Sequence, residues 1–225
     1  MVASILRQQA SALAKALLSA VGLTSSTRPV VQQKPTIMTT YQSENLEKAT
    51  FGTGCFWCTE ALYESLDGVF DAVSGYEGGQ KANPTYNEVC TGTTGHAECV
   101  EVLYDPKKIT YQELLEAFFR SHDPTTLNRQ GADVGTQYRS VIFYHNDEQK
   151  RLAETAKTEL DKAEAYSSPI VTEISPAETF YTAEAYHQSY FAKNPNQGYC
   201  AFVIAPKLDK FKKVFKEKLK SVEQV

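Results

Sequence analysis

The sequence contains no uninterrupted apolar run of the roughly 18 residues that a membrane-crossing helix requires. It also lacks internal repeats and low-complexity segments, which excludes solenoid architectures. The formal net charge is -4 and no basic stripe is interleaved with aromatic residues, so a nucleic-acid surface is excluded. These absences leave a globular chain of 225 residues, 42% of them hydrophobic, which is enough for the core of one domain.

The chain has few cysteines, and their number is odd. Five cysteines argue against a secreted disulfide framework and for a reducing compartment. A structural zinc site needs a second pair of ligands, yet no second Cys-x-x-Cys follows Cys55-x-x-Cys58, and Cys90, His96 and Cys99 are irregularly spaced. We therefore expect no metal ion and no bound cofactor.

Acidic residues are absent before Glu44, whereas this part of the chain holds four basic residues. These are Arg7, Lys15, Arg28 and Lys34. The composition of residues 1–43 resembles a mitochondrial transit peptide, and the alternative is a disordered extension. We expect a mitochondrial protein in the first case and a cytoplasmic one otherwise, with Met38 as a second possible start. Residues 44–225 are expected to form a single catalytic domain that ends in a helix.

Strand-like and helix-like patterns alternate after residue 45 without a steady βαβ rhythm. The expected strands are 48–52, 69–74, 99–104, 140–145 and 170–174. The expected helices are 56–67, one opened by the capping box Thr110 to Glu113, 147–165, 183–191 and 207–222. Two long loops, 75–98 and 122–138, separate them, and loops of this length are commonly functional. The pattern predicts an α+β fold, a two-layer sandwich of a mixed sheet and helices.

Cys55 lies where a strand, a glycine turn and a helix meet. Gly52 and Gly54 can take positive φ, and the apolar spacing after Cys55 is helical. A thiol at a helix N-terminus is expected to have a lowered pKa, which makes Cys55 a candidate nucleophile. The alternative is a buried cysteine that acts only as a small apolar residue. Phe56 and Trp57 add two aromatic faces beside the sulfur.

Six motifs in order resemble those of the peptide methionine sulfoxide reductase A family, over roughly residues 46–206. They are Gly54-Cys55-Phe56-Trp57, Gly75-Tyr76-Glu77-Gly78-Gly79, Asn83-Pro84-Thr85-Tyr86, Gly95-His96-Ala97-Glu98, Asp133-Val134-Gly135-Thr136-Gln137-Tyr138-Arg139-Ser140 and Glu184-Ala185-Tyr186-His187-Gln188. The resemblance implies a ferredoxin-like core. It also implies a thiol enzyme that reduces the S epimer of methionine sulfoxide, free or in proteins.

The resemblance implies a role for each site residue. Cys55 would attack the sulfoxide sulfur and Glu98 would supply the proton that the sulfoxide oxygen needs. Tyr86 and Tyr138 would donate hydrogen bonds to that oxygen, and Asp133 would hold the hydrogen bonds of the site in place.

Two aromatic residues and one histidine complete these expectations. Phe56 and Trp57 would form the apolar wall for the methyl group and stem of the substrate. His187 is expected to be a structural hydrogen-bonding residue. Taken singly, the two tyrosines are more typical of packing, the aspartate of an Asx turn, and Glu98 of a solvated carboxylate paired with His96.

Recycling of a Cys55 sulfenic acid needs a second thiol and a reductant, for which the family implies thioredoxin, or dithiothreitol in an assay. Cys200 follows a segment with Pro and Gly that suits a mobile loop, and we favour it as the resolving thiol. Cys58 is the alternative, and Cys90 and Cys99 are expected to be structural thiols. We expect a monomer. A thiol-disulfide oxidoreductase is the rival enzyme class, because Cys-x-x-Cys at a helix start also serves that chemistry.

Overall fold

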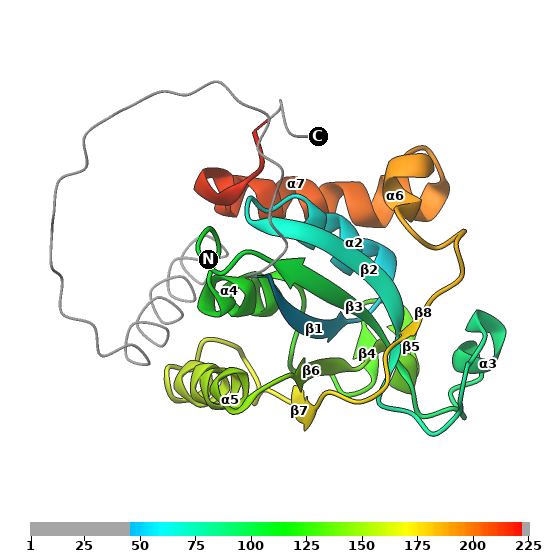
Figure 1. Ribbon diagram of the computed structural model, residues 1–225, viewed down its shortest axis with the longest axis horizontal. Coiled ribbons are helices and arrows are strands. Elements are labelled where there is room, and N and C mark those ends of the chain that lie inside the picture. Colours follow the sequence, from blue (N-terminus) through cyan, green and yellow to red (C-terminus); the bar gives the residue numbers. More distant parts are fainter. Residues whose placement is uncertain (1–45, 222–225) are drawn as a thin grey trace, which may run out of the picture.

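A computed structural model describes residues 46–221. The expected N-terminal extension 1–43 therefore lies outside the described residues. The sheet has six strands in the order β7-β6-β1-β3-β2-β8, antiparallel except between β6 and β7. A separate hairpin pairs β4 with β5. The strands are β1 Glu47–Thr53, β2 Val69–Glu77, β3 Ala97–Tyr104, β4 Arg129–Gln130, β5 Asp133–Val134, β6 Ser140–Tyr144, β7 Glu173–Pro176 and β8 Tyr181–Thr182. This mixed sheet with helices confirms the α+β fold (Figure 1).

Helices connect the strands and close the C-terminal part of the domain. The α-helices are α2 Phe56–Glu64, α3 Tyr86–Cys90, α4 Tyr111–Ser121, α5 Asp147–Lys162, α6 Tyr190–Lys193 and α7 Ala205–Val214. Short 3-10 turns cover Thr136–Tyr138 and Lys216–Lys218, and a π-helix covers Cys200–Ile204. The chain order β1-α2-β2 and β3-α4-β6, with β6-β1-β3-β2 side by side, is the split βαβ arrangement of ferredoxin-like folds.

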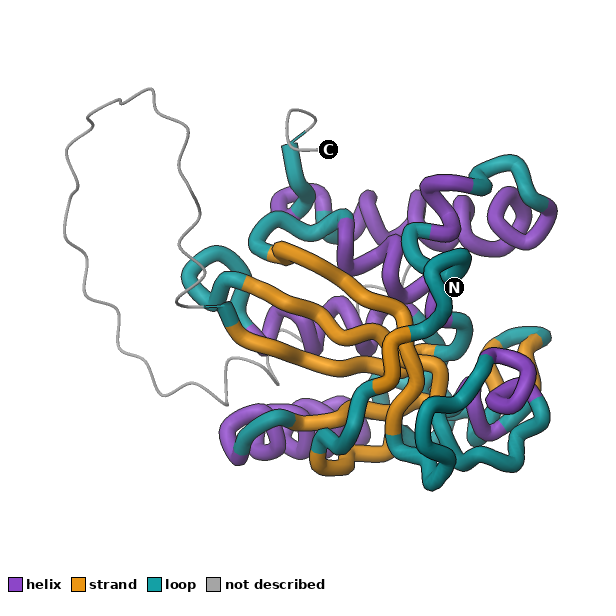
Figure 2. The backbone as a smooth tube through the Cα atoms, turned by 45° about the vertical axis from the view of Figure 1, so that its right-hand side comes forward, coloured by secondary structure: helices purple, strands orange, loops and turns teal. Residues whose placement is uncertain are grey.

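The main core lies between the sheet and the helices α2 and α4, which stand behind the strands in Figure 2. Because side chains alternate along a strand, Ala49 and Phe51 of β1 face these helices. The Phe51 ring stacks on Tyr63 at 5.1 Å and lies 5.5 Å from the Phe118 ring. The opposite face of the sheet has a smaller core, against which Phe180 packs from the chain between β7 and β8.

Three expected elements differ in the structure because backbone groups find partners elsewhere. The expected strand 170–174 begins only at Glu173, since the N–H groups of Ile170 and Val171 bond to Asp161 Oδ1 and the Pro124 carbonyl. The expected helix 207–222 ends at Val214, and the chain leaves it to bond the end of α2.

The expected helix 183–191 is a turn followed by the single helical turn α6. The Gln188 side chain bonds both the N–H and the carbonyl of Ser74 at the edge of β2, and Ser189 takes a left-handed conformation with φ of 51°. This segment is therefore fixed by the sheet edge instead of by its own helical hydrogen bonds. Helix α3 was not expected, although Thr85 and Glu88 form a capping box that opens it.

Between residues 46 and 221, no helix combines the length and the apolar character that crossing a membrane requires.

Phe51 is the residue at which we expect a substitution to reduce the stability of this core most clearly. Phe51→Ala should lower the free energy of unfolding by about 3–5 kcal/mol, because the cavity would lie among aromatic rings that cannot close over it. Denaturant titration measures the change. Phe202→Ala is the matched control, since the Phe202 side chain is 84% exposed and its loss should change stability by less than about 0.5 kcal/mol. Equal effects of the two changes would contradict the placement of the core.

Candidate active site

Cys55 is the N-cap residue of α2, directly after the turn that ends β1. Gly54 has φ of 95°, and a Cβ added there would lie 2.7 Å from the Gln130 Cβ atom. A Cβ on Gly52 would lie 2.7 Å from a Val141 methyl carbon and 3.0 Å from the Glu98 carbonyl oxygen. Larger side chains would therefore displace either the strand end or its neighbours. The strand-turn-helix predicted around Cys55 is confirmed.

The expected low pKa of Cys55 is wrong for this structure. A hydrogen bond with the Cys58 thiol, burial, and the negative charge of Glu98 raise the pKa of Cys55 well above its usual value, against a smaller effect of the Cys58 N–H. The same thiol-thiol hydrogen bond lowers the pKa of Cys58. The favourable effect of the helix end is outweighed by the Cys58 thiol, by burial and by the charge of Glu98.

Glu98 approaches α2 from the neighbouring strand β3 and is 1% exposed. Its Oε2 accepts a hydrogen bond of 3.1 Å from the backbone N–H of Phe56, whereas Oε1 is buried without a hydrogen-bond partner. Burial raises the pKa of Glu98 to about 8, despite the opposing effect of the Phe56 N–H. The group is therefore mostly a neutral acid at pH 7, held beside Cys55, and not the solvated carboxylate that is the usual state of Glu.

Tyr86 and Tyr138 bring two phenols to the same region from α3 and from the turn Thr136–Tyr138. Both are half-buried. Burial is the main cause that raises the pKa of each phenol, and the charge of Glu98 adds to it in both. The two groups therefore remain hydrogen-bond donors over the whole physiological pH range.

Asp133 fixes a third tyrosine that the sequence did not single out. Its Oδ2 accepts a hydrogen bond of 2.6 Å from the hydroxyl of Tyr199. The Tyr199 ring in turn meets the Trp57 ring edge-on at 6.2 Å. Asp133 thus joins the hairpin β4-β5 to the C-terminal segment that carries Cys200. The signal for Tyr199 was its position in Gly198-Tyr199-Cys200.

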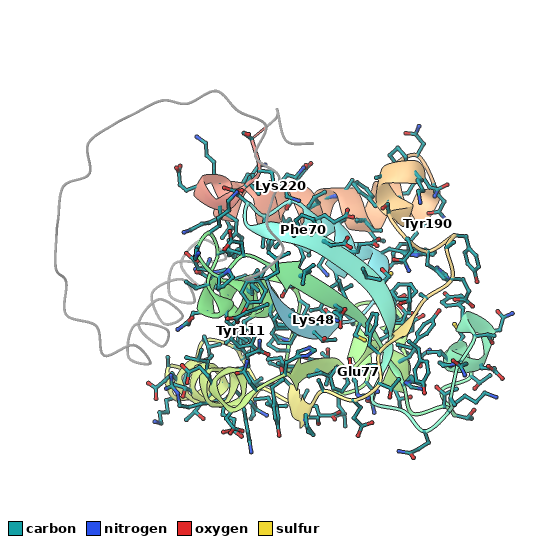
Figure 3. The ribbon with its side chains drawn as sticks, viewed as in Figure 1. Lys48, Phe70, Glu77, Tyr111, Tyr190 and Lys220 are labelled. Carbon is teal, nitrogen blue, oxygen red and sulfur yellow. The ribbon has the colours of Figure 1, made fainter. Side chains whose placement is uncertain are left out.

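Phe56 and Trp57, the residues expected to form the apolar wall, lie at the start of α2 among further rings; Phe56 is 1% exposed and Trp57 is partly buried. The Trp57 ring stacks on the ring of Tyr190 in α6, with 3.7 Å between the ring centroids and 7° between the ring planes. Tyr190 is labelled in Figure 3. The indole N–H of Trp57 donates to His187 Nδ1 at 3.0 Å, and the Phe56 ring lies 5.0 Å from the imidazole. His187 is thus the hydrogen-bonding residue that the sequence predicted. Tyr190 was missed, because only the folded chain brings it to Trp57.

Cys200 follows a turn at residues 194–197, which lies in the segment that the sequence predicted as a loop. Cys200 lies in the π-helix, is fully buried, and packs with Cys58 in one apolar cluster. Burial and the neighbouring Cys58 raise the pKa of Cys200. Of the two cysteines expected to be structural thiols, Cys99 is buried and Cys90 is exposed.

His96 does not pair with Glu98. Its Nδ1 accepts from the Gly79 N–H at 3.1 Å and its Nε2 lies 2.8 Å from the Lys81 carbonyl oxygen, so it holds the loop after β2. Among the described residues, no group of three or more His, Cys, Asp and Glu side chains is arranged to hold a metal ion.

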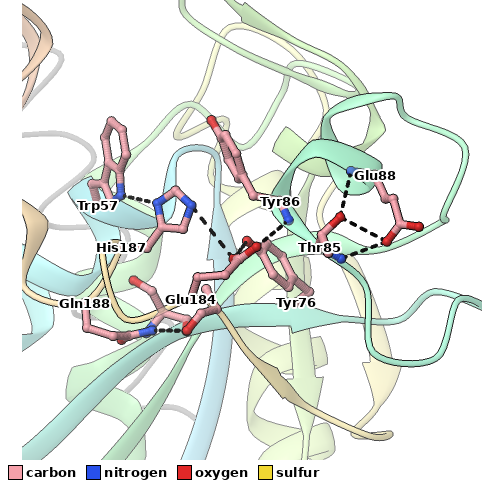
Figure 4. Close-up of polar contacts among 10 residues, drawn as sticks. Trp57, Tyr76, Thr85, Tyr86, Glu88, Glu184, His187 and Gln188 are labelled. Carbon is pink, nitrogen blue, oxygen red and sulfur yellow. Dashed lines mark hydrogen bonds and ion pairs between the residues drawn. The ribbon is translucent and has the colours of Figure 1, made fainter.

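Glu184 is a further site residue that the sequence did not assign. Dashed lines in Figure 4 join it to both Tyr86 and His187, and its Oε1 accepts from the Tyr86 N–H at 2.9 Å. Its position in the motif Glu184-Ala185-Tyr186-His187-Gln188 was the available signal.

Comparison with known proteins agrees with this geometry. The family model described as peptide methionine sulfoxide reductase matches residues 47–219. A protein named MsrA from Polynucleobacter asymbioticus is 56% identical over 171 residues, covering 76% of this chain and 90% of that protein. An MsrA from Thermus thermophilus is 56% identical over 174 residues, covering 77% and 98%.

Solved structures give the same assignment. Reduced Mxr1 from Saccharomyces cerevisiae matches with a TM-score of 0.65 and 41% identity, covering 71% of this chain and 92% of that one. Methionine sulfoxide reductase A of Corynebacterium diphtheriae matches with a TM-score of 0.61 and 40% identity, covering 70% and 79%. With a family match over most of the described residues and relatives more than half identical, the chain belongs to the peptide methionine sulfoxide reductase A family of oxidoreductases.

Proposed function

We propose that this protein reduces methionine S-sulfoxide, free or in proteins, to methionine, and so repairs oxidatively damaged proteins. The observation that carries the proposal is the buried carboxyl of Glu98, which accepts from the N–H of Phe56, the residue after Cys55, and is largely neutral at pH 7. A sulfoxide is a poor electrophile until its oxygen is protonated or strongly hydrogen-bonded. A nucleophile next to a neutral acid matches that requirement.

In the proposed reaction the Cys55 thiolate attacks the sulfoxide sulfur while Glu98 protonates the oxygen. The oxygen passes to Cys55, which leaves methionine and a sulfenic acid. Neutral Glu98 also removes the like charge that opposes ionisation of Cys55. Tyr86 and Tyr138, whose phenols stay protonated, donate hydrogen bonds to the oxygen as its charge grows.

The remaining assigned residues position the reactants. Phe56 and Trp57 take the methyl group and stem of the substrate against aromatic faces, and Asp133 fixes the segment opposite them through Tyr199. The reductase proposal uses all of these groups, whereas disulfide exchange uses only Cys55 and Cys58.

Separated S and R epimers of a methionine sulfoxide peptide test the proposal, with dithiothreitol as reductant. The protein should reduce the S epimer alone, and Cys55→Ser should abolish turnover because a serine hydroxyl has no comparable anion population near neutral pH. Cys99→Ser is the matched control, since Cys99 is buried in the second core, away from Cys58 and Cys200. Rapid reduction of insulin disulfides without sulfoxide turnover would favour the rival class.

Glu98→Gln should slow methionine release about 10² to 10⁴-fold. In the wild type, the single-turnover rate should fall as the pH rises through about 8, because the raised pKa of Glu98 means that its proton is lost there. The Gln variant should lack this fall.

Thiol alkylation gives a second readout of Glu98 that does not depend on turnover. Above pH 8 the wild-type carboxylate raises the pKa of Cys55, so an uncharged glutamine should make Cys55 react faster with iodoacetamide. A Gln variant that reduces sulfoxide as fast as the wild type from about pH 6 to about pH 9 would remove Glu98 from the mechanism.

For recycling we propose that the Cys55 sulfenic acid condenses with a second thiol, releasing water, and that thioredoxin reduces the resulting disulfide. The sequence favoured Cys200 as the direct partner. The hydrogen bond between Cys55 and Cys58, and the burial of Cys200 against Cys58, favour a two-step order in which Cys58 reacts first and Cys200 then attacks Cys58.

Peptide mapping after one equivalent of substrate tests this order. Cys200→Ser should accumulate a Cys55–Cys58 disulfide, because the first step needs no movement of the π-helix. Cys58→Ser should instead accumulate sulfenic acid, which a dimedone adduct detects. Rapid formation of a Cys55–Cys200 disulfide in Cys58→Ser would restore Cys200 as the direct partner.

Two proposals concern the cellular context. The basic, acid-free composition of residues 1–43 supports import into mitochondria, and a chain started at Met38 would remain in the cytoplasm. We also propose that the protein acts as a monomer.

A further inference from the structure

The motif Glu184 to Gln188 takes no part in the proposed chemistry, yet its side chains connect Trp57 and Tyr86, the two walls that the proposed function places around the substrate. Trp57 lies on α2 and Tyr86 on α3, which follow different strands of the sheet. Figure 4 shows Glu184 and His187 between them. The contacts of these two side chains indicate what the connection does.

His187 has a defined proton position because its neighbour can only donate. The indole N–H of Trp57 points to Nδ1 at 3.0 Å, so Nδ1 carries the lone pair and the ring proton is on Nε2. His187 is 1% exposed, and burial lowers its pKa, which keeps the ring neutral. Its Nε2 has no hydrogen-bond partner and faces Glu184 Oε2 at 3.9 Å.

Glu184 divides its two oxygens between different elements. Oε1 accepts from the backbone N–H of Tyr86, the first residue of α3, at 2.9 Å. Oε2 accepts from the Tyr76 hydroxyl at 2.9 Å and faces His187. Burial opposes the charge, but the Tyr86 N–H and the Tyr76 hydroxyl hold the pKa of Glu184 below its usual value. The carboxylate is thus charged and bound on both sides.

A single carboxylate therefore fixes the backbone that carries the Tyr86 phenol and faces the imidazole that orients Trp57. Under the proposed function, Trp57 contacts the apolar end of the substrate and Tyr86 its oxygen. The distance between these two groups decides whether the sulfur lies in line with Cys55. Glu88 also caps α3, through Thr85, but it is on the solvent side and contacts neither wall.

We propose that Glu184 is a positioning residue of the reductase, which sets Trp57 and Tyr86 relative to each other through His187 and the first N–H of α3. The inference rests on the proposed function and deepens it. The geometry of the carboxylate, more than its charge, carries this role, because both oxygens make directed contacts.

Three variants test the proposal. Glu184→Asp shortens the carboxylate, so it cannot reach both partners, and kcat for the S-sulfoxide peptide should fall about 10²-fold with a smaller change in KM. Glu184→Gln keeps an oxygen for the Tyr86 N–H and should retain most of the rate. Glu88→Asp is the matched control and should behave as wild type, since it shortens a different carboxylate, one on the first turn of α3 that contacts neither Trp57 nor His187.

Fluorescence reports on the other wall without any turnover. Trp57 is the only tryptophan, so a shift of its emission in Glu184→Asp, absent in Glu88→Asp, measures the loss of the indole-imidazole geometry. His187→Phe removes the link itself and should shift the emission and lower kcat, which keeps the test intact if Glu184→Asp does not fold.

Several outcomes would overturn the inference. These are wild-type kinetics and emission in Glu184→Asp or in His187→Phe, an equal loss in Glu88→Asp, and a larger loss in Glu184→Gln than in Glu184→Asp. Failure of the proposed function is distinct from all of these, because it would appear as a wild-type protein that leaves the sulfoxide unreduced. The emission comparison would still test the link between Glu184 and Trp57.

Discussion

The hydrogen bond from the Phe56 N–H to Glu98 joins the start of α2 to the central strand β3, and the site depends on it. A helix N-terminus stabilises a nearby anion by about 0.3–1 kcal/mol when exposed. Burial of a carboxyl acts in the opposite direction, and each pKa unit corresponds to about 1.4 kcal/mol. Because burial dominates, the pKa of Glu98 rises to about 8 while its position stays fixed. The same contact therefore holds an acid in place and lets it keep its proton.

The pKa of the Cys55 thiol also depends on burial and on neighbouring groups. Cys55 shares the helix end with Glu98, and a second negative charge there is costly in a water-poor site. The pair Cys55 and Cys58 shares a hydrogen bond, which distributes one ionisation over two sulfurs. Cys55, Glu98 and Cys58 thus influence one another's ionisation.

The C-terminal part of the domain packs against α2, which follows the first strand of the sheet. Gln188 fastens it to the edge of β2, and from there the chain brings His187 and Tyr190 against Trp57. The π-helix then buries Cys200 against Cys58 of α2. Single-turn and π-helical pieces replace a regular helix here because tertiary hydrogen bonds, and not helix propensity, decide the backbone path. His187, Tyr190 and the buried thiol of Cys200 consequently belong to one continuous segment.

The sequence by itself determined the α+β class, the strand-turn-helix around Cys55, the capping box at Thr110 and the identity of the motif residues, because these depend on local periodicity, glycine freedom and side-chain chemistry. Only the tertiary structure decided the pKa of Cys55, the neutral state of Glu98, and the contacts that Glu184 makes. Burial and the approach of charges from other strands are properties of the packed chain, and they outweigh the local helix-end effect that a sequence displays.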